Sequence, residues 1–345
     1  MKRKKTKKKK ITLLTKLCII ADVLAITCFI IFYGPWNGFR NLLINTALKT
    51  KDHEYLAKVF YSDETIKKVK SSNYFITIDD DSETDAIVID TREKEKYDNE
   101  YDKQILTRDA GNEDYKLIKL KVGLSNGYLI AIYDPTKVSL IRAKKFNVGA
   151  YGEQVTAMCK RYGGLVCINA GGFIDITGTG SDIPNGYVID DGKIVWPLSK
   201  WSTQKGNLIG FNEEGIMMLL SNTTGTEALE KGMKDAIEFG PFLIVNGTPL
   251  EIVGDPWGRS PRVAIAQRRD GVVLFLVIDG ENYVNGATLQ DTVDILLKYG
   301  AYNAANLDGG HSASLSINGK LYNNPPSVAK KQGGRYVVTG FGLIP

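Results

Sequence analysis

The longest apolar run of the chain lies near its amino end. Leu17–Tyr33, read as LCIIADVLAITCFIIFY, carries one charged side chain in seventeen positions, and Ile11–Leu14 extends the run towards the amino end. A helix of this length and composition is long enough to span the hydrocarbon core of a bilayer. We therefore predict a transmembrane anchor over residues 17–33, with the lipid bilayer as a partner.

A lysine-rich segment precedes this anchor. Residues 1–16 carry nine Lys or Arg and no acid, which by the positive-inside tendency predicts a cytoplasmic tail. Tyr33 and Trp36 fit the aromatic belt at the opposite interface. The expected topology is a single-pass protein of the cell membrane with its body outside the cell. A cleaved signal peptide is the alternative, but the run continues to Tyr33 without a convincing small-x-small cleavage site.

Beyond the anchor, the polar and apolar positions predict strands joined by tight turns. Two-residue hairpin turns favour Asn-Gly or Asp-Gly because their residues need positive φ. Five such pairs have β-rich flanks: Asn126-Gly127, Asp191-Gly192, Asn246-Gly247, Asp270-Gly271 and Asn318-Gly319. The predicted fold class is therefore α+β, with antiparallel-rich mixed β-sheets and a few packed helices behind one transmembrane helix.

Two helices are expected to interrupt the strands. One runs from about Glu153 to Tyr162 and the other from Thr288 to Tyr299. Thr288 and Asp291 have the spacing of a capping box, and an apolar stripe follows them. A glycine ends each helix, which is a common C-terminal signal.

The same two places resemble each other in sequence. Tyr162-Gly163 is followed by an apolar run to Asn169 and then Gly171-Gly172, and Tyr299-Gly300 by a run to Asn306 and then Asp308. Gly309-Gly310 completes the second copy. Each copy predicts a helix, a buried strand and a glycine corner. We call these the first corner (Gly171-Gly172) and the second corner (Gly309-Gly310); such corners let backbone N–H groups approach a ligand.

The remaining organisation follows from composition. Residues 34–104 are expected to form a membrane-proximal helical segment and a charged spacer, and residues 105–345 the catalytic domain. The net charge is +5, so without the nine basic residues of the tail the body carries 5 − 9 = −4. A nucleic-acid role for the basic tail would be expected to come with a basic face on the folded part, so the mildly acidic body argues against a nucleic-acid partner.

Cysteine and histidine usage narrows the metal chemistry. Cys159 and Cys167 flank a predicted helix end and strand, which fits either an extracellular disulfide or two buried thiols. His53 and His311 lie outside any Cys or His cluster, so a zinc site of the usual kind is not expected.

Several polar side chains stand where the predicted strands end. Asp308 precedes the second corner, where its carboxylate is accessible unless it only caps the turn. Arg262 offers a planar fork for two phosphate oxygens, with a surface salt bridge as the alternative. Glu238 and Asp279 each stand at a strand boundary. Sugar-transfer chemistry uses two carboxylates, so Asp308 with either of them is a candidate pair.

Five segments stand in an order that resembles the phosphodiester glycosidase family. They are INAGGF (168–173), EFGPFLIVNG (238–247), SPR (260–262), VIDG (277–280) and NLDGGHSASL (306–315). The resemblance covers roughly residues 115–345. That family includes the lysosomal uncovering enzyme, which removes N-acetylglucosamine from mannose phosphate. His311 is a departure, because members commonly carry a small or hydroxyl residue there, and it puts substrate specificity in doubt.

The resemblance and the residues together predict an extracytoplasmic hydrolase of sugar 1-phosphodiester bonds in a surface glycan or related phosphodiester. Arg262 and the two corners would hold the phosphodiester, Asp308 with Asp279 or Glu238 would supply acid and base, and His311 would shuttle a proton. The other substrate-binding candidates are Asn169, Gly171, Gly172, Gly240, Asn306, Gly309, Gly310 and Ser312.

Two rival functions remain open at this stage. One is a phosphodiesterase that attacks phosphorus with Ca²⁺ or Mg²⁺ bound by Asp279 and Asp308. The other is a non-catalytic glycan-binding module of an envelope assembly. The glycine-rich loop Thr177–Gly186 lacks the lysine of a nucleotide P-loop and predicts a mobile rim or an ordinary surface loop.

Overall fold

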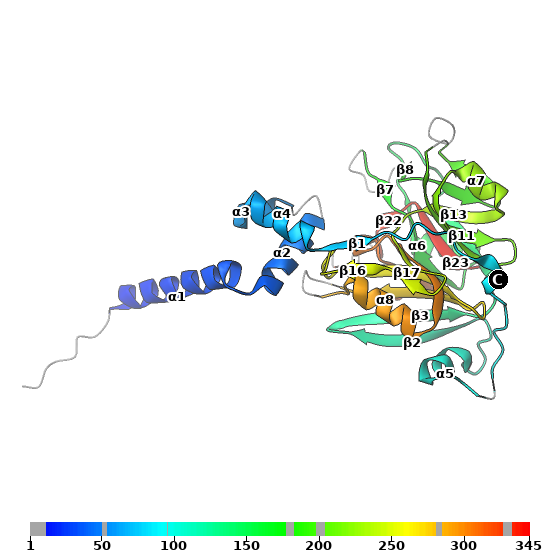
Figure 1. The fold of residues 1–345 in the computed structure, drawn as a ribbon, viewed down its shortest axis with the longest axis horizontal. Coiled ribbons are helices and arrows are strands. Elements are labelled where there is room, and N and C mark those ends of the chain that lie inside the picture. The colour runs from blue at the N-terminus through cyan, green and yellow to red at the C-terminus, as the bar shows by residue number, and fades with distance from the viewer. Residues whose placement is uncertain are drawn as a thin grey trace, which may run out of the picture. The chain divides into compact units, whose positions relative to one another are not determined.

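In the computed structural model the amino-terminal apolar run forms one continuous helix, α1 (Leu13–Tyr33) (Figure 1). Thr12 caps it by accepting a hydrogen bond from the N–H of Thr15 at 3.3 Å. None of its residues is buried, and the helix is long and apolar enough to cross a membrane. The predicted apolar helix is therefore present and begins four residues earlier than expected.

The structure describes residues 12–49, 54–94, 96–176, 183–197, 204–280, 285–326 and 333–345. They belong to two units, Met1–Ser71 and Ser72–Pro345. The first unit contains α1, α2 (Asn37–Lys49), α3 (Glu54–Phe60) and α4 (Asp63–Ser71). Its small core includes Ile44 and Ile66, and the rings of Phe32 and Phe60 stack with centroids 4.5 Å apart.

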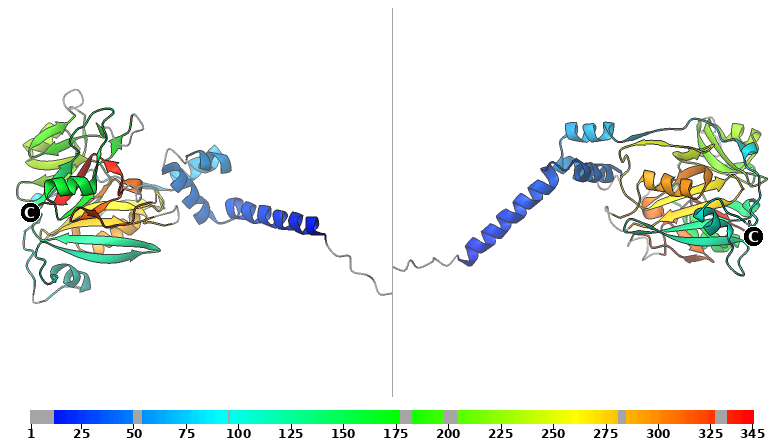
Figure 2. Two further views of the ribbon diagram at one scale, coloured as in Figure 1. Left: turned by 180° about the vertical axis from the view of Figure 1, so that it is seen from behind. Right: turned by 60° about the horizontal axis from the view of Figure 1, so that its bottom comes forward.

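The second unit is built on three main antiparallel sheets, seen from two sides in Figure 2. The seven-stranded sheet has the order β15 (Thr248–Pro249), β14 (Phe242–Val245), β19 (Ala301–Leu307), β17 (Arg262–Arg268), β18 (Val273–Ile278), β3 (Ser125–Ile132), β2 (Tyr115–Val122). One five-stranded sheet has the order β21 (Lys320–Leu321), β20 (Leu315–Ile317), β6 (Val166–Asn169), β23 (Thr339–Leu343), β4 (Val138–Arg142). The other has the order β10 (Lys193–Trp196), β9 (Val188–Asp190), β13 (Met233–Glu238), β11 (Gly206–Asn212), β12 (Met217–Thr223).

Three two-stranded pairings complete the described strands. They are β1 (Tyr74–Ile76) with β16 (Glu251–Val253), β5 (Glu153–Gln154) with β22 (Tyr336–Val337), and β7 (Phe173–Ile174) with β8 (Ile183–Pro184). Every pairing in the described part of the chain is antiparallel, which confirms the predicted fold class.

Each main sheet turns one face to a shared core and packs a helix on its other face. The shared core takes side chains from all three sheets, such as Ile209, Phe275 and Phe341. On the outer faces lie α8 (Leu289–Lys298) with α5 (Glu100–Leu106), α7 (Gly225–Glu230), and α6 (Val155–Tyr162). Figure 1 shows α8 across the strands of the seven-stranded sheet. Strand β18 is buried at all six positions because its sheet is covered on both faces.

The two predicted helices are confirmed. Thr288 caps α8 in a capping box with Asp291, and each side chain accepts a backbone N–H at 3.0 Å. Gly163 ends α6 in the left-handed conformation, with φ 72° and ψ 19°. Each helix leads directly into a buried strand, α6 into β6 and α8 into β19.

Three of the five predicted hairpin turns have positive φ at both turn residues: Asp191-Gly192, Asn246-Gly247 and Asn318-Gly319. Asp270-Gly271 lies in a longer connection between β17 and β18, where only Gly271 has positive φ. The prediction at Asn126-Gly127 is wrong, because these residues lie inside β3.

The hairpin between β2 and β3 turns at Gly123-Leu124 instead, since Val122 pairs with Ser125. Gly123 has φ +57°, which places glycine at the first central position of the turn. Gly127 serves close packing, because a Cβ there would lie 3.2 Å from the Cβ of Leu120.

The charged segment before residue 105 belongs to the second unit, which begins at Ser72. The N–H of Ser82 donates to the carbonyl of Leu219 at 2.9 Å, and that of Val88 donates to the carbonyl of Arg269 at 2.9 Å. Ile87 is buried among these contacts. A solvated spacer over this stretch was expected from its charge; intermittent apolar residues and backbone pairing hold it against the sheets instead.

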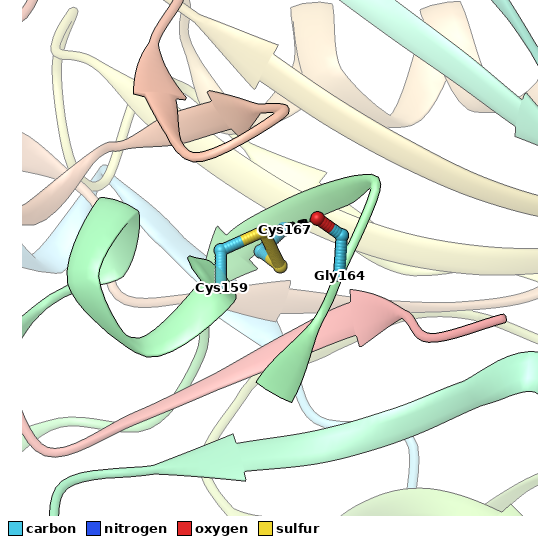
Figure 3. The surroundings of a disulfide bond; sticks show 3 residues. All are labelled: Cys159, Gly164 and Cys167. Atoms are coloured by element: carbon cyan, nitrogen blue, oxygen red, sulfur yellow. Dashed lines mark hydrogen bonds between the residues drawn. A yellow bond between two sulfur atoms is a disulfide. The ribbon is translucent and has the colours of Figure 1, made fainter. Parts of the chain in front are cut away.

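Cys159 of α6 and Cys167 of β6 form a disulfide, with their Cα atoms 5.8 Å apart (Figure 3). The bridge closes a segment with a sequence separation of 8 and fastens the helix to its sheet. Gly164 and Gly342 leave room for it, because a Cβ at either would lie within 3.0 Å of the Cys167 sulfur.

Removing the bridge is expected to destabilise the second unit. A loop of this length constrains the unfolded chain by about 2 to 3 kcal/mol, so Cys159→Ser/Cys167→Ser should lower the free energy of unfolding by that amount. The measurement is denaturant unfolding of the full chain in detergent, followed by tryptophan fluorescence. Cys18→Ser/Cys28→Ser is the matched control, because both thiols are free and exposed on α1. Equal stability of the two double variants would contradict the assignment.

Candidate active site

The two glycine corners lie together because the strands before them end at the same place. The N–H of Asp308 donates to the carbonyl of Ala170 at 2.8 Å. The buried side-chain amide of Asn169 donates to the carbonyl of Asp308 at 2.6 Å and accepts from the N–H of Ser314 at 2.9 Å. Both polar atoms of Asn169 are thus used inside the protein, and its amide fastens β6 to β19 rather than facing a ligand.

One N–H of each corner is bonded and the other is not. The N–H of Gly171 donates to the hydroxyl of Thr339 at 3.0 Å, and that of Gly310 donates to a main-chain carbonyl at 3.0 Å. The N–H groups of Gly172 and Gly309 make no hydrogen bond with any residue that the structure describes. These two half-buried residues therefore retain donors for a ligand.

Close packing requires glycine at these two positions. A Cβ at Gly172 would lie 2.9 Å from Cε2 of Phe239, and one at Gly309 would lie 2.5 Å from the carbonyl oxygen of Pro261. The first corner thus packs on the residue after Glu238, and the second corner packs on the residue before Arg262. Four of the five motif segments meet here.

Glu238 ends β13 in a tight, largely buried position. Its Oε2 accepts a hydrogen bond from the N–H of Tyr187 at 3.0 Å. A Cβ at Gly186 or Gly206 would come within 3.0 Å of its carboxyl group, so two glycines make room for the side chain. Burial raises the pKa of Glu238, and the Tyr187 hydrogen bond offsets part of that rise. This carboxyl group is therefore suited to holding a proton.

Asp308 and the residues after the second corner have different exposures. Asp308 is half-buried at the end of β19, and His311 is exposed on the single turn Gly310–Ser312. Ser312 is buried, and its N–H donates to the carbonyl of Gly309 at 3.1 Å. Asp308 and His311 are thus at least partly exposed to solvent, whereas Ser312 is buried.

Asp279 is a buried organising carboxylate. Its Oδ1 accepts from Nδ2 of Asn323 at 3.0 Å and from the N–H of Asn324 at 2.9 Å. Asn323 in turn accepts from the N–H of Leu315 at 2.8 Å. Burial, with Asp279 nearby, raises the pKa of Tyr128 to about 12. Asp279 therefore holds the chain after β21 against the start of β20, next to the second corner.

The guanidinium group of Arg262 donates hydrogen bonds within the protein. Its Nε donates to the carbonyl of Ala287 at 3.0 Å and its Nη2 to the carbonyl of Gly258 at 2.7 Å. The side chain is buried, and burial lowers its pKa to about 10 although Asp255 favours the charged form. These contacts support a role in fastening two loops to β17, which differs from the expected contact with phosphate.

Asn306 and Gly240 join the corner before β14 to β19. The N–H of Asn306 donates to the carbonyl of Pro241 at 3.0 Å, and its Nδ2 to the carbonyl of Gly240 at 3.2 Å. Its buried Oδ1 has no hydrogen-bond partner among the described residues. Asn306 is thus positioned like Asn169, at the end of a buried strand, but keeps one unused acceptor.

The structure thus brings Asp308 and the two corners to one place, with Phe239, the residue after Glu238, packed on the first corner. Asn169, Asp279 and Arg262 make hydrogen bonds that hold the surrounding segments together. Sequence reasoning missed the partners Thr339, Ser314, Tyr187 and Asn323. Thr339 lies 168 residues from Gly171, and no local pattern marks such a pairing. The Asn323-Asn324-Pro325-Pro326 run signals a turn, but the signal does not name Asp279 as its partner.

Within the described ranges, no group of three or more His, Cys, Asp or Glu side chains is placed to hold a metal ion. The predicted cation ligands also differ in environment, because Asp279 accepts hydrogen bonds from two nitrogen donors through Oδ1. Residues 177–182 of the predicted rim loop lie outside the described residues.

Comparison with known proteins identifies relatives of this region. The family described as phosphodiester glycosidase matches residues 162–344. A protein of Bacillus subtilis (strain 168), the SPbeta prophage-derived uncharacterized protein YomE, is 29% identical over 179 residues, which are 50% of this chain and 27% of that protein. The N-acetylglucosamine-1-phosphodiester alpha-N-acetylglucosaminidase of Bos taurus is 39% identical over 66 residues, which are 19% of this chain and 12% of that protein. The chain thus matches about a quarter or less of the length of these relatives.

A solved structure supports the same fold. The zebrafish N-acetylglucosamine-1-phosphodiester alpha-N-acetylglucosaminidase catalytic domain, auto-inhibited by its pro-peptide, superposes with a TM-score of 0.55 at 21% identity. The match covers 70% of this chain and 87% of that chain. At this identity the likeness concerns the fold.

The different roles assigned to Asp279 and Asp308 can be tested by measuring the stability of variants. Asp279→Ala leaves the buried Nδ2 of Asn323 and the partly buried N–H of Asn324 without their acceptor, at about 1 to 3 kcal/mol each, so the free energy of unfolding should fall by about 3 kcal/mol. Asp308→Ala at the half-buried position should change it by less than about 1 kcal/mol. Denaturant unfolding of both variants measures the difference. A larger loss for Asp308→Ala would overturn the division into organising and accessible carboxylates.

Proposed function

This chain belongs to the phosphodiester glycosidase family, and we propose that its Ser72–Pro345 unit hydrolyses sugar 1-phosphodiester bonds in a surface glycan or a related phosphodiester. The observation that carries the proposal is the meeting of the two glycine corners beside the accessible Asp308. The matched region, residues 162–344, contains all five motif segments.

The unbonded N–H groups of Gly172 and Gly309 are the proposed donors to the phosphate oxygens. Backbone N–H groups that are fixed before the substrate arrives stabilise developing negative charge without reorganisation. Gly171 and Gly310 have a structural role in this proposal, since their own N–H groups donate hydrogen bonds within the protein that fix the shape of the two corners. Neutralising the phosphate makes the phosphomonoester a better leaving group.

Glu238 and Asp308 are the proposed acid and base. Glu238 is half-buried, and this burial raises its pKa, so it is the proposed donor of a proton to the leaving phosphate oxygen as the bond from sugar carbon to oxygen breaks. Asp308 takes a proton from the attacking water, whose oxygen becomes the sugar hydroxyl. Exposed His311 accepts and returns protons at the entrance. Asp279, Arg262, Asn169 and Asn306 position these groups.

Isotope labelling tests the reaction against its rival at phosphorus. Hydrolysis of a sugar 1-phosphodiester in ¹⁸O-labelled water should place the label in the sugar hydroxyl. Label in the phosphate would show attack at phosphorus, as a metal-dependent phosphodiesterase would perform it. Glycan affinity without any turnover would show a binding module.

The proposed location is the cell membrane, with α1 as the anchor, residues 1–16 in the cytoplasm and the second unit outside. The Cys159–Cys167 disulfide supports this location, because disulfides form and persist in oxidising compartments. The apolar length of α1 and the lysines before it support the anchor and its orientation.

External protease should therefore remove the second unit from intact cells while an epitope placed at the amino end stays protected. Immunoblotting for both ends of the chain provides the measurement. Survival of the second unit until the cells are lysed would show that the orientation is inverted.

The carboxylate roles predict separate kinetic signatures. A general acid or base contributes about 10²- to 10⁴-fold to a rate, so Asp308→Asn and Glu238→Gln should each lower turnover at least 100-fold. Because burial raises the pKa of Glu238, turnover should fall with rising pH only above the usual glutamate range. Glu238→Gln should abolish this alkaline limb and Asp308→Asn should keep it. A limb that persists in Glu238→Gln would assign the proton donor to another group.

A further inference from the structure

Arg335 lies beside the first corner and has no acidic partner among the described residues. Its guanidinium carbon is 4.8 Å from the ring centroid of Phe173, which directly follows Gly172. No ion pair or hydrogen bond joins the Arg335 side chain to any residue that the structure describes. Other arginines of the second unit do have such partners, including Arg142 with Asp190 and Arg161 with Glu153.

The backbone around Arg335 is held from two sides. Tyr336 pairs with Gln154 in the β5–β22 ladder, and Nε2 of Gln154 donates to the carbonyl of Gly334 at 3.1 Å. A Cβ at Gly334 would lie 3.5 Å from the hydroxyl oxygen of Ser314, whose N–H is bonded to Asn169. Arg335 therefore lies near two parts of the site: Ser314, which is hydrogen-bonded to Asn169, and Phe173, which follows the first corner.

The surroundings of Arg335 leave its positive charge available for an anion. An aromatic face orients a guanidinium without neutralising its charge, so the Phe173 ring positions Arg335 and leaves its N–H donors for another partner. The half-buried position limits competition from water. Arg262, which was expected to play this role from the sequence, donates to two main-chain carbonyls instead.

We propose that Arg335 is the residue that selects an anionic substrate, by donating two hydrogen bonds to the non-bridging phosphate oxygens beside the N–H of Gly172. This inference rests on the proposed function and adds the group by which the enzyme would distinguish a sugar phosphodiester from an uncharged glycoside. The planar fork matters, because paired donors fit two phosphate oxygens and the point charge of a lysine does not. Phe173 acts as a positioning residue.

The kinetic test uses the full chain in detergent with two substrates of the same sugar, a 1-(alkyl phosphate) diester and a 4-nitrophenyl glycoside. Arg335→Gln should lower kcat/KM on the diester by 30-fold or more, Arg335→Lys by about 10-fold, and both should change the neutral glycoside less than 3-fold. Hydrogen bonds to charged groups are among the strongest in proteins, and this sets the expected scale. Phe173→Leu should show a smaller loss in the same direction. Equal losses on both substrates, or none on the diester, would overturn the proposal.

Arg269→Gln is the matched control. Arg269 also lies over an aromatic ring, with its guanidinium carbon 4.3 Å from the Tyr302 centroid, but it directly follows β17, whose other end is Arg262. Its variant should keep both activities within 2-fold. A loss at Arg269 as large as that at Arg335 would show a general charge effect and contradict a local site.

A binding measurement separates this inference from the proposed reaction. Inorganic phosphate should bind the wild-type chain in calorimetry and bind Arg335→Gln at least 10-fold more weakly. If the wild type hydrolyses no diester yet shows this difference, the proposed reaction fails and the anion site stands. Equal phosphate affinity in both proteins, or no binding to either, overturns the Arg335 assignment.

Discussion

The buried amide of Asn169 fixes the end of a strand in one sheet to the end of a strand in another. It donates to the carbonyl of Asp308 and accepts from the N–H of Ser314, while the N–H of Asp308 reaches Ala170. A buried amide with both polar atoms bonded is costly to disturb, because its partners would lose their hydrogen bonds without access to water. The accessible carboxylate and both glycine corners take their positions from this fastening.

The polar groups around Asn169 fall into two sets, one structural and one proposed to bind the ligand. Polar atoms that are hydrogen-bonded within the protein hold the shape of the site: both polar atoms of the Asn169 amide, the Oδ1 of Asp279, and the Nε and Nη2 of Arg262. The proposed ligand-binding groups are the N–H groups of Gly172 and Gly309, the half-buried Asp308, and Arg335 beside the ring of Phe173. Preorganisation of this kind lets the front groups meet a phosphodiester without first rearranging.

Local patterns predicted much of the fold. The apolar run became α1, the capping box at Thr288 began α8, and three Asn-Gly or Asp-Gly pairs became hairpin turns, because each of these depends on residues close together in the chain. The pair at Asn126-Gly127 misled because Gly123, three residues earlier, supplies the turn. The many charges before residue 105 predicted a solvated spacer, but they do not report the backbone hydrogen bonds that this stretch makes with residues far along the chain.

The sequence by itself determined the antiparallel α+β architecture, the apolar helix and the motif segments around which the site is built. Only the tertiary structure decided which polar residues hold the site and which face outwards. The local sequence around Arg262 and Arg335 does not distinguish an arginine that donates to main-chain carbonyls from one without such hydrogen bonds among the described residues. That distinction arises from contacts such as those of Arg262 with Ala287 and of Arg335 with Phe173, between segments that are far apart in the chain. Burial then sets the hydrogen-bonding role and charge preference of each group.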